Sequence, residues 1–166
     1  MPFGRAWTDD LRLEDFAAFH RAALAEWTPE SWDCNFVTFL DGEPIGTQGL
    51  HGHDFGATRT VGSGSWLGAA FQGQGYGTEQ RAAVLELAFR GLGAVAAETG
   101  AVAANRRSQR VTEKLGYRFA FENTVSPRPG ESVPHLNYRL EREDWRSPFP
   151  VALEGLDACR HLFGAV

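Results

Sequence analysis

The sequence predicts a single domain of mixed α/β class, and three observations lead to this prediction. The chain has 166 residues, a length common for one domain. Hydrophobic residues make up 43% of it, which suffices for a packed core. The expected elements follow in the order helix, three-strand meander, helix, strand, helix and hairpin. Because no repeat, low-complexity tract or linker interrupts that order, we expect one domain over residues 1–166.

The first half of the chain predicts one helix and three strands after a short loop. Apolar residues recur at helical spacing up to Trp27, and Thr28 ends the pattern because a residue that precedes proline avoids the helical region. Asp41–Gly42 separates two β-like runs and is a strong hairpin signal. The expected elements are a loop over 1–8, a helix over Asp9–Trp27, and strands over Asn35–Leu40, Pro44–His53 and Thr58–Leu67.

The second half predicts alternating helices and strands. A glycine-rich stretch from Gly68 to Gly77 comes first. Gly91 and Gly93 then close a helix with an apolar face, and the short apolar run after it predicts a central strand. The expected helices cover Thr78–Arg90, Asn105–Gly116 and Ala152–Phe163, and the expected strands cover Ala94–Ala97 with some residues beyond, Tyr117–Val125 and Pro134–Leu140.

Three glycines alternate at Gly73, Gly75 and Gly77, directly after a predicted strand and before a predicted helix. Glycine lets the backbone turn its N–H groups outward, and a helix N-terminus adds unpaired donors, so the pattern indicates an anion site. The spacing lacks the third glycine of a Rossmann fingerprint and the G-K-[ST] of a Walker loop. By itself, the motif fits a plain strand-to-helix turn equally well.

A second motif follows one predicted strand later, from Asn105 to Tyr117. Asn105 is a good N-cap residue, and Gly116 is a good residue to end the helix. A serine on the inward face of this helix is either a satisfied core hydroxyl or a positioned proton donor. Helical spacing places four residues on that face: Ser108, Val111, Thr112 and Leu115.

Together the motifs Q-x-x-G-x-G at Gln72–Gly77 and N-x-x-S-x-x-V-x-x-K-L-G-Y from Asn105 resemble those of the GNAT acetyltransferase superfamily, and the N-x-x-S form resembles its RimJ/RimL-like branch. The resemblance covers about residues 58–140. It implies a mixed, mostly antiparallel sheet flanked by helices, with residues 141–166 as a C-terminal extension. Members usually begin with a further strand and helix, which are expected to be missing here. Three residues would then lie near the acceptor pocket: Phe3, Arg5 and Trp7.

The resemblance implies acetyl-CoA as the co-substrate and assigns residues to it. In such enzymes the glycine loop holds the CoA pyrophosphate, and the strand before it lends backbone groups to the pantetheine. One amide, here that of Leu67, polarises the thioester carbonyl. The asparagine contacts the pantetheine arm or orders its helix. The implied CoA-binding residues are Ser65, Trp66, Leu67, Gln72, Gly73, Gln74, Gly75, Tyr76, Gly77, Thr78, Asn105 and Ser108.

Catalytic residues are implied less directly. Many members carry a tyrosine seven residues after the asparagine as the acid for the leaving thiolate, and this chain has Thr112 there. The branch that it resembles implies Ser108 as the general acid instead. An attacking amine must lose a proton, and the candidate bases are Glu98 after the central strand and His135 or Glu122 on the final hairpin. Each of these is otherwise an ordinary strand or surface side chain.

The resulting hypothesis is N-acyl transfer from acetyl-CoA to a primary amine of a small molecule or a protein N-terminus, by direct attack. The alternatives are a non-catalytic CoA-binding or sensor domain, and a transferase with another acyl group or a hydroxyl acceptor. We expect no metal, since His51 and His53 have no third ligand at obvious spacing. A homodimer is expected because similar proteins commonly form one.

Composition narrows the partners and the location. The formal net charge of -5 argues against nucleic-acid binding, because proteins bind nucleic acids mainly through basic surfaces. No stretch approaches the ~18 apolar residues of a membrane span, and the N-terminus has no apolar signal region. Two cysteines are too few for a disulfide framework, so we expect a reducing compartment, the cytoplasm.

Overall fold

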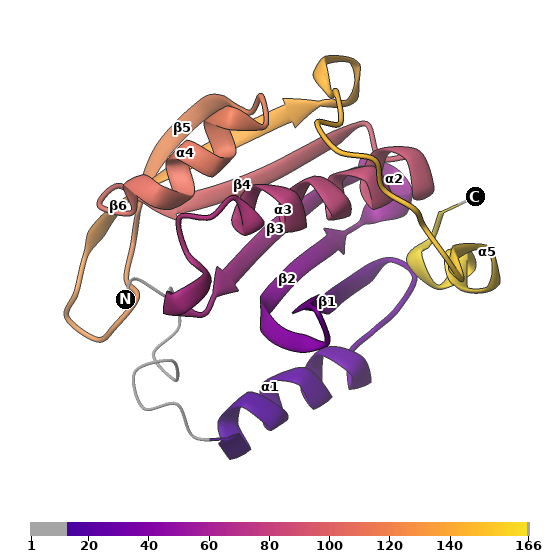
Figure 1. Cartoon of the computed structure of the whole chain (residues 1–166), viewed down its shortest axis with the longest axis horizontal. Coiled ribbons are helices and arrows are strands. Elements are labelled where there is room, and N and C mark those ends of the chain that lie inside the picture. The colour runs from indigo at the N-terminus through magenta and orange to yellow at the C-terminus, as the bar shows by residue number, and fades with distance from the viewer. Residues whose placement is uncertain (1–12, 166) are drawn as a thin grey trace.

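The structure is a computed structural model that describes residues 13–165. Its centre is one six-stranded sheet with the order β1-β2-β3-β4-β6-β5 (Figure 1). Neighbouring strands are antiparallel except for the parallel pair β3 and β4, so the prediction of a mixed, mostly antiparallel sheet is confirmed. The strands are β1 (Ser31–Leu40), β2 (Glu43–His53), β3 (Thr60–Leu67), β4 (Ala96–Val102), β5 (Arg118–Val125) and β6 (Val133–Glu141).

Two helices, α3 and α4, lie on the same face of the sheet, and α1 packs beside the edge strand β1 (Figure 1). None of the helices between residues 13 and 165 combines the length and the apolar character that crossing a bilayer needs. The helical elements are α1 (Leu13–Ala25), α2 (Phe55–Thr58), the 3-10 turn η2 (Ala69–Phe71), α3 (Tyr76–Glu86), the π-helical turn η3 (Leu87–Gly91), α4 (Arg106–Lys114), the 3-10 turn η4 (Arg142–Asp144), α5 (Leu156–Cys159) and the 3-10 turn η5 (Arg160–Phe163).

The hairpin of β1 and β2 turns at Asp41 and Gly42, as the sequence predicts. Asp41 has φ 49° and Gly42 has φ 85°. Positive φ at both central residues is the geometry of a type I′ turn, which matches the twist of the strands. β1 starts at Ser31, ahead of the predicted Asn35, because Thr28 closes a turn onto Ser31. The turn at Asp41 and Gly42 fixes the register of β2 against β1, and this register decides which side chains of β2 face the helices.

β3 and β4 pair over only four residue pairs, the last of which is Ser63 with Thr99. Beyond it, β3 stays paired with β2 alone, and β4 stays paired with β6 alone. The two strands therefore diverge in the middle of the sheet. We call the gap between residues 64–67 of β3 and 100–102 of β4 the β3–β4 fork.

The core lies between the sheet and the helices α3 and α4. Alternate residues of each strand face the helices, and these include Leu50, Val61 and Leu140, which are all fully buried. The residues between them, such as Glu98 and Arg139, lie on the opposite face. The sheet therefore has one helix-covered face and one face that carries partly exposed polar side chains.

A segment over residues 145–165 runs across α3 and reaches the edge strand β1 (Figure 1). The Trp145 indole donates to Glu86 in α3 (2.7 Å). At the far end of the segment, the Trp32 indole donates to the Phe163 carbonyl (3.1 Å), and the two rings pack edge to face. The segment therefore joins the C-terminal end of α3 to the edge strand β1.

The central strand β4 begins at Ala96, later than the predicted Ala94. The Ala94 amide still donates to the Ala88 carbonyl at the end of the preceding helical turn (2.9 Å), which keeps it out of the strand. β4 then continues well past the predicted core of the strand, so Glu98 lies inside β4 and does not follow it. Similarly, β3 begins only after Thr58, because α2 includes that residue.

Two predicted helices have different limits. The first, expected from Thr78, begins at Tyr76, and its α-helical part ends at Glu86, where the turn η3 replaces the last α-helical turn. The helix expected over Ala152–Phe163 is instead the two short turns α5 and η5, because the chain takes positive φ (75°) at Gly155 just before α5. The predicted loop over residues 1–8 lies outside the described residues, as does the predicted helix start.

Leu50→Ala is expected to lower the free energy of unfolding by about 2–5 kcal/mol, because the side chain is fully buried and its removal leaves a cavity. Urea denaturation followed by circular dichroism measures the change. Leu24→Ala is the matched control, since Leu24 is 71% exposed, and it should change the value by less than about 0.5 kcal/mol. Equal losses in the two variants would contradict the burial pattern.

Candidate active site

The glycine loop leads from β3 into α3 and leaves its backbone amides without acceptors. Gly73 has φ 78° and Gly75 has φ 99°, values that favour glycine. Among the described residues, no acceptor pairs with the amide N–H groups of Gly73–Gly77, and the first bonds come from Thr78 and Glu79 to the Gly75 carbonyl. A Cβ at Gly73 or Gly75 would meet nothing within 4 Å, so the space beside the loop is open. The loop can therefore receive an anion.

Gln72 ties this loop to two neighbouring elements. Its Nε2 donates to the Leu67 carbonyl at the end of β3 (2.9 Å), and its Oε1 accepts from Arg107 in α4 (2.7 Å). Gln74 likewise donates to the Ala70 carbonyl (2.8 Å). The two glutamine side chains thus shape the loop, and the backbone amides are the groups left for a ligand.

The helix α4 begins at the fork end of β4 and carries the candidate acid. Asn105 caps it as predicted, because its Oδ1 accepts from the Ser108 amide (3.2 Å), and the helix ends before Gly116 at φ 88°. Ser108 is half-buried, and its carbonyl accepts from Thr112 Oγ1 (3.0 Å). The Ser108 hydroxyl has no hydrogen bond to another described residue, so it is available as a donor to a ligand.

The helix α3 carries an arginine that the sequence motifs do not single out. Arg81 is 3% exposed, and its guanidinium donates to Thr112 Oγ1 (3.0 Å) and Ser65 Oγ (3.1 Å). Desolvation lowers the pKa of Arg81, and the nearby Tyr117 phenol raises it. One sequence signal could have found Arg81: it stands four residues before Leu85, on the inward side of the helix.

Tyr117 lies beside Arg81 in the same buried cluster. Burial raises the pKa of the Tyr117 phenol, against the smaller lowering effects of the Arg81 charge and the Ser63 hydroxyl. The Ser63 and Tyr117 hydroxyls approach each other without forming a well-aligned hydrogen bond. Tyr117 is therefore a protonated, buried donor close to the last β3–β4 pair.

Buried polar atoms without a partner gather around the fork. Ser63 belongs to the last β3–β4 pair, and Gln48 is paired with Ser65 just beyond it. Native structures leave few such atoms, and each calls for an explanation. The fork is therefore the place where a bound molecule would satisfy groups that the chain itself leaves open. Within residues 13–165 these atoms are Gln48 Oε1, Ser63 Oγ, Arg81 Nε, Tyr117 Oη and His135 Nδ1.

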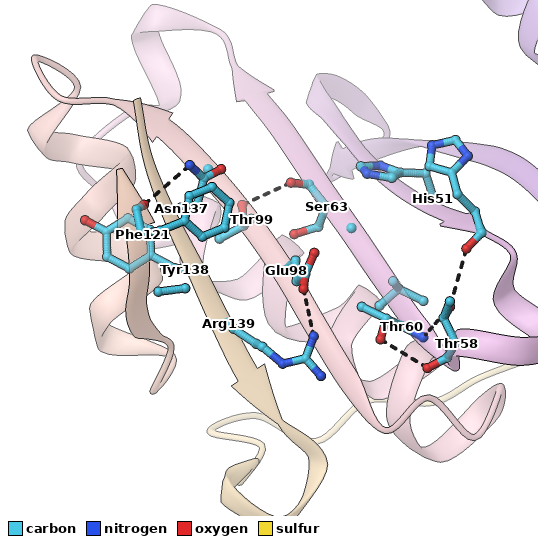
Figure 2. A pocket seen from close by; sticks show the side chains of 15 residues that line it. His51, Thr58, Thr60, Ser63, Glu98, Thr99, Phe121, Asn137, Tyr138 and Arg139 are labelled. Atoms are coloured by element: carbon cyan, nitrogen blue, oxygen red, sulfur yellow. Dashed lines mark hydrogen bonds and ion pairs between the residues drawn. The ribbon is translucent and has the colours of Figure 1, made fainter. Parts of the chain in front are cut away.

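The opposite face of the sheet is hollowed over the paired part of β3 and β4, as far as Gly100 at the start of the fork. The hollow has a volume of about 500 Å³, and His51, Glu98 and Asn137 are among the side chains that line it (Figure 2). Figure 2 shows Glu98 turned toward Arg139, whose Nη1 donates to Glu98 Oε1 at 2.7 Å. Arg139 also binds Glu141 at 2.6 Å, and the hydrogen bonds to the two carboxylates raise its pKa.

Of the three candidate bases, Glu98 and His135 share this face and Glu122 does not. The His135 ring lies so close to Gly100 that a side chain at that position would collide with it. Glu122 is paired with Leu136, which packs against the core, so Glu122 lies on the helix-covered side of the sheet. The structure therefore places Glu98 in the lining of the hollow and His135 next to it, against Gly100, and it separates Glu122 from both.

The predicted CoA-binding residues form a continuous path along the fork. Ser65–Leu67 line its β3 side, Gln72–Thr78 form the loop that follows, and Asn105 and Ser108 start the helix that flanks it. Their contacts with CoA stay predictions. The residues expected near the acceptor pocket from the N-terminal segment lie outside the described residues: Phe3, Arg5 and Trp7.

His51 and His53 have ordinary partners on the exposed face of β2. Their rings lie 5.6 Å apart, and His51 Nδ1 lies 4.0 Å from Asp33 Oδ1. His53 Nδ1 and the Ser31 hydroxyl are 3.0 Å apart. Across the described ranges, no three His, Cys, Asp or Glu side chains are placed together to hold a metal ion.

A family model matches most of the chain. Residues 3–118 match the model described as the acetyltransferase (GNAT) domain. The chain belongs to the GNAT acetyltransferase family. This confirms the resemblance that the two sequence motifs indicate, and it makes this chain an acetyltransferase of the GNAT type.

Solved structures agree with the GNAT fold. RimJ of Mycobacterium smegmatis, in complex with CoA-disulfide, has a TM-score of 0.70 at 22% identity, over 86% of this chain and 68% of that one. A spermidine N-acetyltransferase SpeG variant from Vibrio cholerae has a TM-score of 0.67 at 12% identity, over 80% and 76%. The aminoglycoside acetyltransferase AAC(6')-Ib, in complex with coenzyme A, has a TM-score of 0.60 at 23% identity, over 74% and 72%. At these identities the likeness is one of fold.

Gly75→Ala is expected to weaken CoA binding about tenfold or more, because alanine is strained at φ 99° and the loop must rearrange its amides to relieve that strain. Isothermal titration with CoA measures the affinity. Gly42→Ala is the matched control, since it places alanine at φ 85° in the β1–β2 turn with equally open space. Both variants should lose stability, but only Gly75→Ala should lose affinity. Equal affinities would remove the loop from the CoA site.

Proposed function

We propose that this GNAT acetyltransferase moves the acetyl group of acetyl-CoA onto a primary amine in a single step. One observation carries the proposal: the β3–β4 fork connects a loop of unpaired amides on the helix-covered side with a hollow and two candidate bases on the other side. In this arrangement, donor and acceptor reach the same gap from opposite faces of the sheet. Direct attack then needs no covalent enzyme intermediate.

The donor side of the fork fits CoA. The amides of Gly73–Gly77 bind the pyrophosphate, aided by the positive end of the α3 dipole. Beyond Ser63, the edge of β3 that faces β4 has no strand partner, so its backbone can pair with the amides of the pantetheine. Open space beside Gly73 and Gly75 supports this fit. Polarisation of the thioester carbonyl by the Leu67 amide stays a prediction.

His135 is the base that the geometry favours. It lies against Gly100 at the fork, and its Nδ1 is buried without a partner. Glu98 is already bound to Arg139 at 2.7 Å, which reduces its availability for an incoming amine. As the amine nitrogen attacks the thioester carbon, its proton passes to His135.

Ser108 is the proposed proton donor to the departing sulfur. It stands in the first turn of α4, and its hydroxyl has no bond to another residue of the described chain. A thiol of pKa ~8.5 is a tolerable leaving group, so this proton transfer contributes modestly to the rate.

The structural neighbours support a primary amine as the acceptor class. Structural neighbours are named as acetyltransferases of spermidine and of aminoglycosides, and one is a RimJ. Polyamines, aminoglycosides and peptide N-termini all present a primary amine, and these form the acceptor panel. A reducing cytoplasmic location stays a prediction from the low number of cysteines. A homodimer stays a prediction.

Thiol release with acetyl-CoA and this panel tests the proposal, and mass spectrometry of the product identifies the acyl group and the bond formed. Acceptor-dependent release of CoA with a mass gain of one acetyl group on nitrogen would support it. CoA binding without turnover on any acceptor would favour the non-catalytic sensor alternative, and an O-acetyl product would favour a hydroxyl acceptor.

Ser108→Ala is expected to lower kcat by tens-fold, about 10–100, because the thiolate then leaves without a donated proton. The Kd for acetyl-CoA should change little, which separates loss of the acid from loss of binding. Ser147→Ala is the matched control, since within residues 13–165 the Ser147 hydroxyl donates to the Phe149 carbonyl and to no other group, in the segment over residues 145–165. An unchanged kcat in Ser108→Ala would remove this residue from the mechanism.

His135→Gln is expected to lower kcat/KM by about 10²–10³, because the amine loses its proton acceptor. Glu98→Gln should lower it only a few-fold, since that carboxylate is held by Arg139. Steady-state kinetics of both variants with the best acceptor decide between the two bases. The reverse order of losses would assign the role to Glu98.

A further inference from the structure

Arg81 is a buried cation for which the described chain supplies no carboxylate. It is 3% exposed, its two hydrogen bonds go to the neutral hydroxyls of Thr112 and Ser65, and its Nε has no partner. None of the ion pairs among residues 13–165 includes it. A buried charge without a counter-charge costs stability, and proteins seldom retain one without a use.

The position of this cation is the fork itself. Ser65 belongs to the β3 side of the gap, just beyond the last β3–β4 pair, and Thr112 belongs to α4, which flanks the gap. Arg81 reaches both from α3, so its guanidinium spans the helix-covered side of the fork. Tyr117, also buried, is the titratable side chain that acts on it there.

The hydrogen bond to Thr112 connects Arg81 with the position of the leaving thiolate. The sequence motif puts Thr112 where many GNAT members carry the tyrosine that acts on the leaving thiolate. Here a threonine accepts a hydrogen bond from the guanidinium at 3.0 Å, and its own hydroxyl donates a hydrogen bond to the Ser108 carbonyl at 3.0 Å. The Thr112 hydroxyl is therefore already used in two hydrogen bonds. The nearby Arg81 guanidinium is the group whose charge can stabilise a developing anion.

We propose that Arg81 stabilises the thiolate that leaves during acetyl transfer, a role that rests on the proposed function of the fork. The amine nitrogen forms a bond to the thioester carbon, the carbon–sulfur bond breaks, and its electron pair stays on sulfur. The proton of the amine goes to the base on the opposite face. As the sulfur departs, its negative charge develops beside the guanidinium. Ser108 donates a proton to the sulfur, solvent returns a proton to Ser108, and the base releases the amine proton to solvent, which completes the balance.

This role explains the missing counter-ion. A carboxylate beside Arg81 would neutralise the charge before the reaction and repel the thiolate as it forms. Neutral hydroxyls instead orient the guanidinium and leave its charge available, which is how preorganised groups stabilise charge that develops in a transition state. An arginine stays protonated across the working range of pH, so the charge does not depend on proton supply.

The test is the affinity of CoA relative to desulfo-CoA, measured by isothermal titration from pH 6 to pH 9. A cation close to the sulfur lowers the pKa of the bound thiol by about one to three units. CoA should therefore gain about tenfold or more over desulfo-CoA as the pH rises, because only CoA can bind as the thiolate. The raised pKa of Tyr117 keeps that phenol neutral over this range.

Two variants separate the charge from the shape of the side chain. Arg81→Met should bind both ligands with a ratio that is independent of pH, while Arg81→Lys should keep part of the gain. In the unliganded protein, Arg81→Met should match or exceed the melting temperature of the unchanged chain, because it removes an uncompensated buried charge. If the role of Arg81 were purely structural, Arg81→Met would instead lower the melting temperature, and the ratio would depend on pH as it does in the unchanged chain.

The outcomes distinguish this inference from the function on which it rests. Failure of the unchanged chain to bind either ligand would overturn the proposed CoA site. Binding of both ligands with a ratio independent of pH would overturn the role of Arg81 and leave the CoA site in place. A ratio that rises with pH equally in Arg81→Met would also overturn it, since the thiol would then be perturbed by another group.

Discussion

The end of the β3–β4 pairing at Ser63 and Thr99 is the constraint on which the rest of the site depends. A sheet that stayed paired to Leu67 would satisfy its own backbone and leave no gap for a thioester. Because the strands part, the edge of β3 is open to a ligand. Buried polar atoms without a partner lie around this gap on both faces of the sheet. The glycine loop lies at one end of that opening, and α4 closes its flank.

The fork also divides the chemistry between two faces of one sheet. The groups proposed to act on the donor, Ser108 and Arg81, lie on the helix-covered side, while the two candidate bases lie on the other face, Glu98 in the hollow and His135 against Gly100. For Glu98 and His135 the alternation of side chains along β4 and β6 decides the face, while Ser108 and Arg81 lie on helices that cover the other face. Proton acceptor and leaving group are thereby kept apart, and they meet only through the substrate that fills the gap.

Local signals predicted the features that local physics decides. Asp41–Gly42 predicted the hairpin turn, Asn105 predicted the N-cap of α4, and the two motifs predicted the family. Features that arise from distant pairing were not readable in this way. The register that ends at Thr99, the sharing of one face by Glu98 and His135, and the burial of Arg81 all depend on segments that meet only in the folded chain. Glu122 shows the same limit, because a bulge between Phe119 and Phe121 helps set its face.

The segment over residues 145–165 has a consequence for how the fold is assembled over time. It contacts the C-terminal end of α3, and it joins Phe163 to Trp32 across 131 positions of sequence. Contacts between such distant positions form late, since the loop between them must close first. During synthesis, the C-terminal end of α3 and the edge strand β1 are therefore linked through this segment only after residue 163 has left the ribosome.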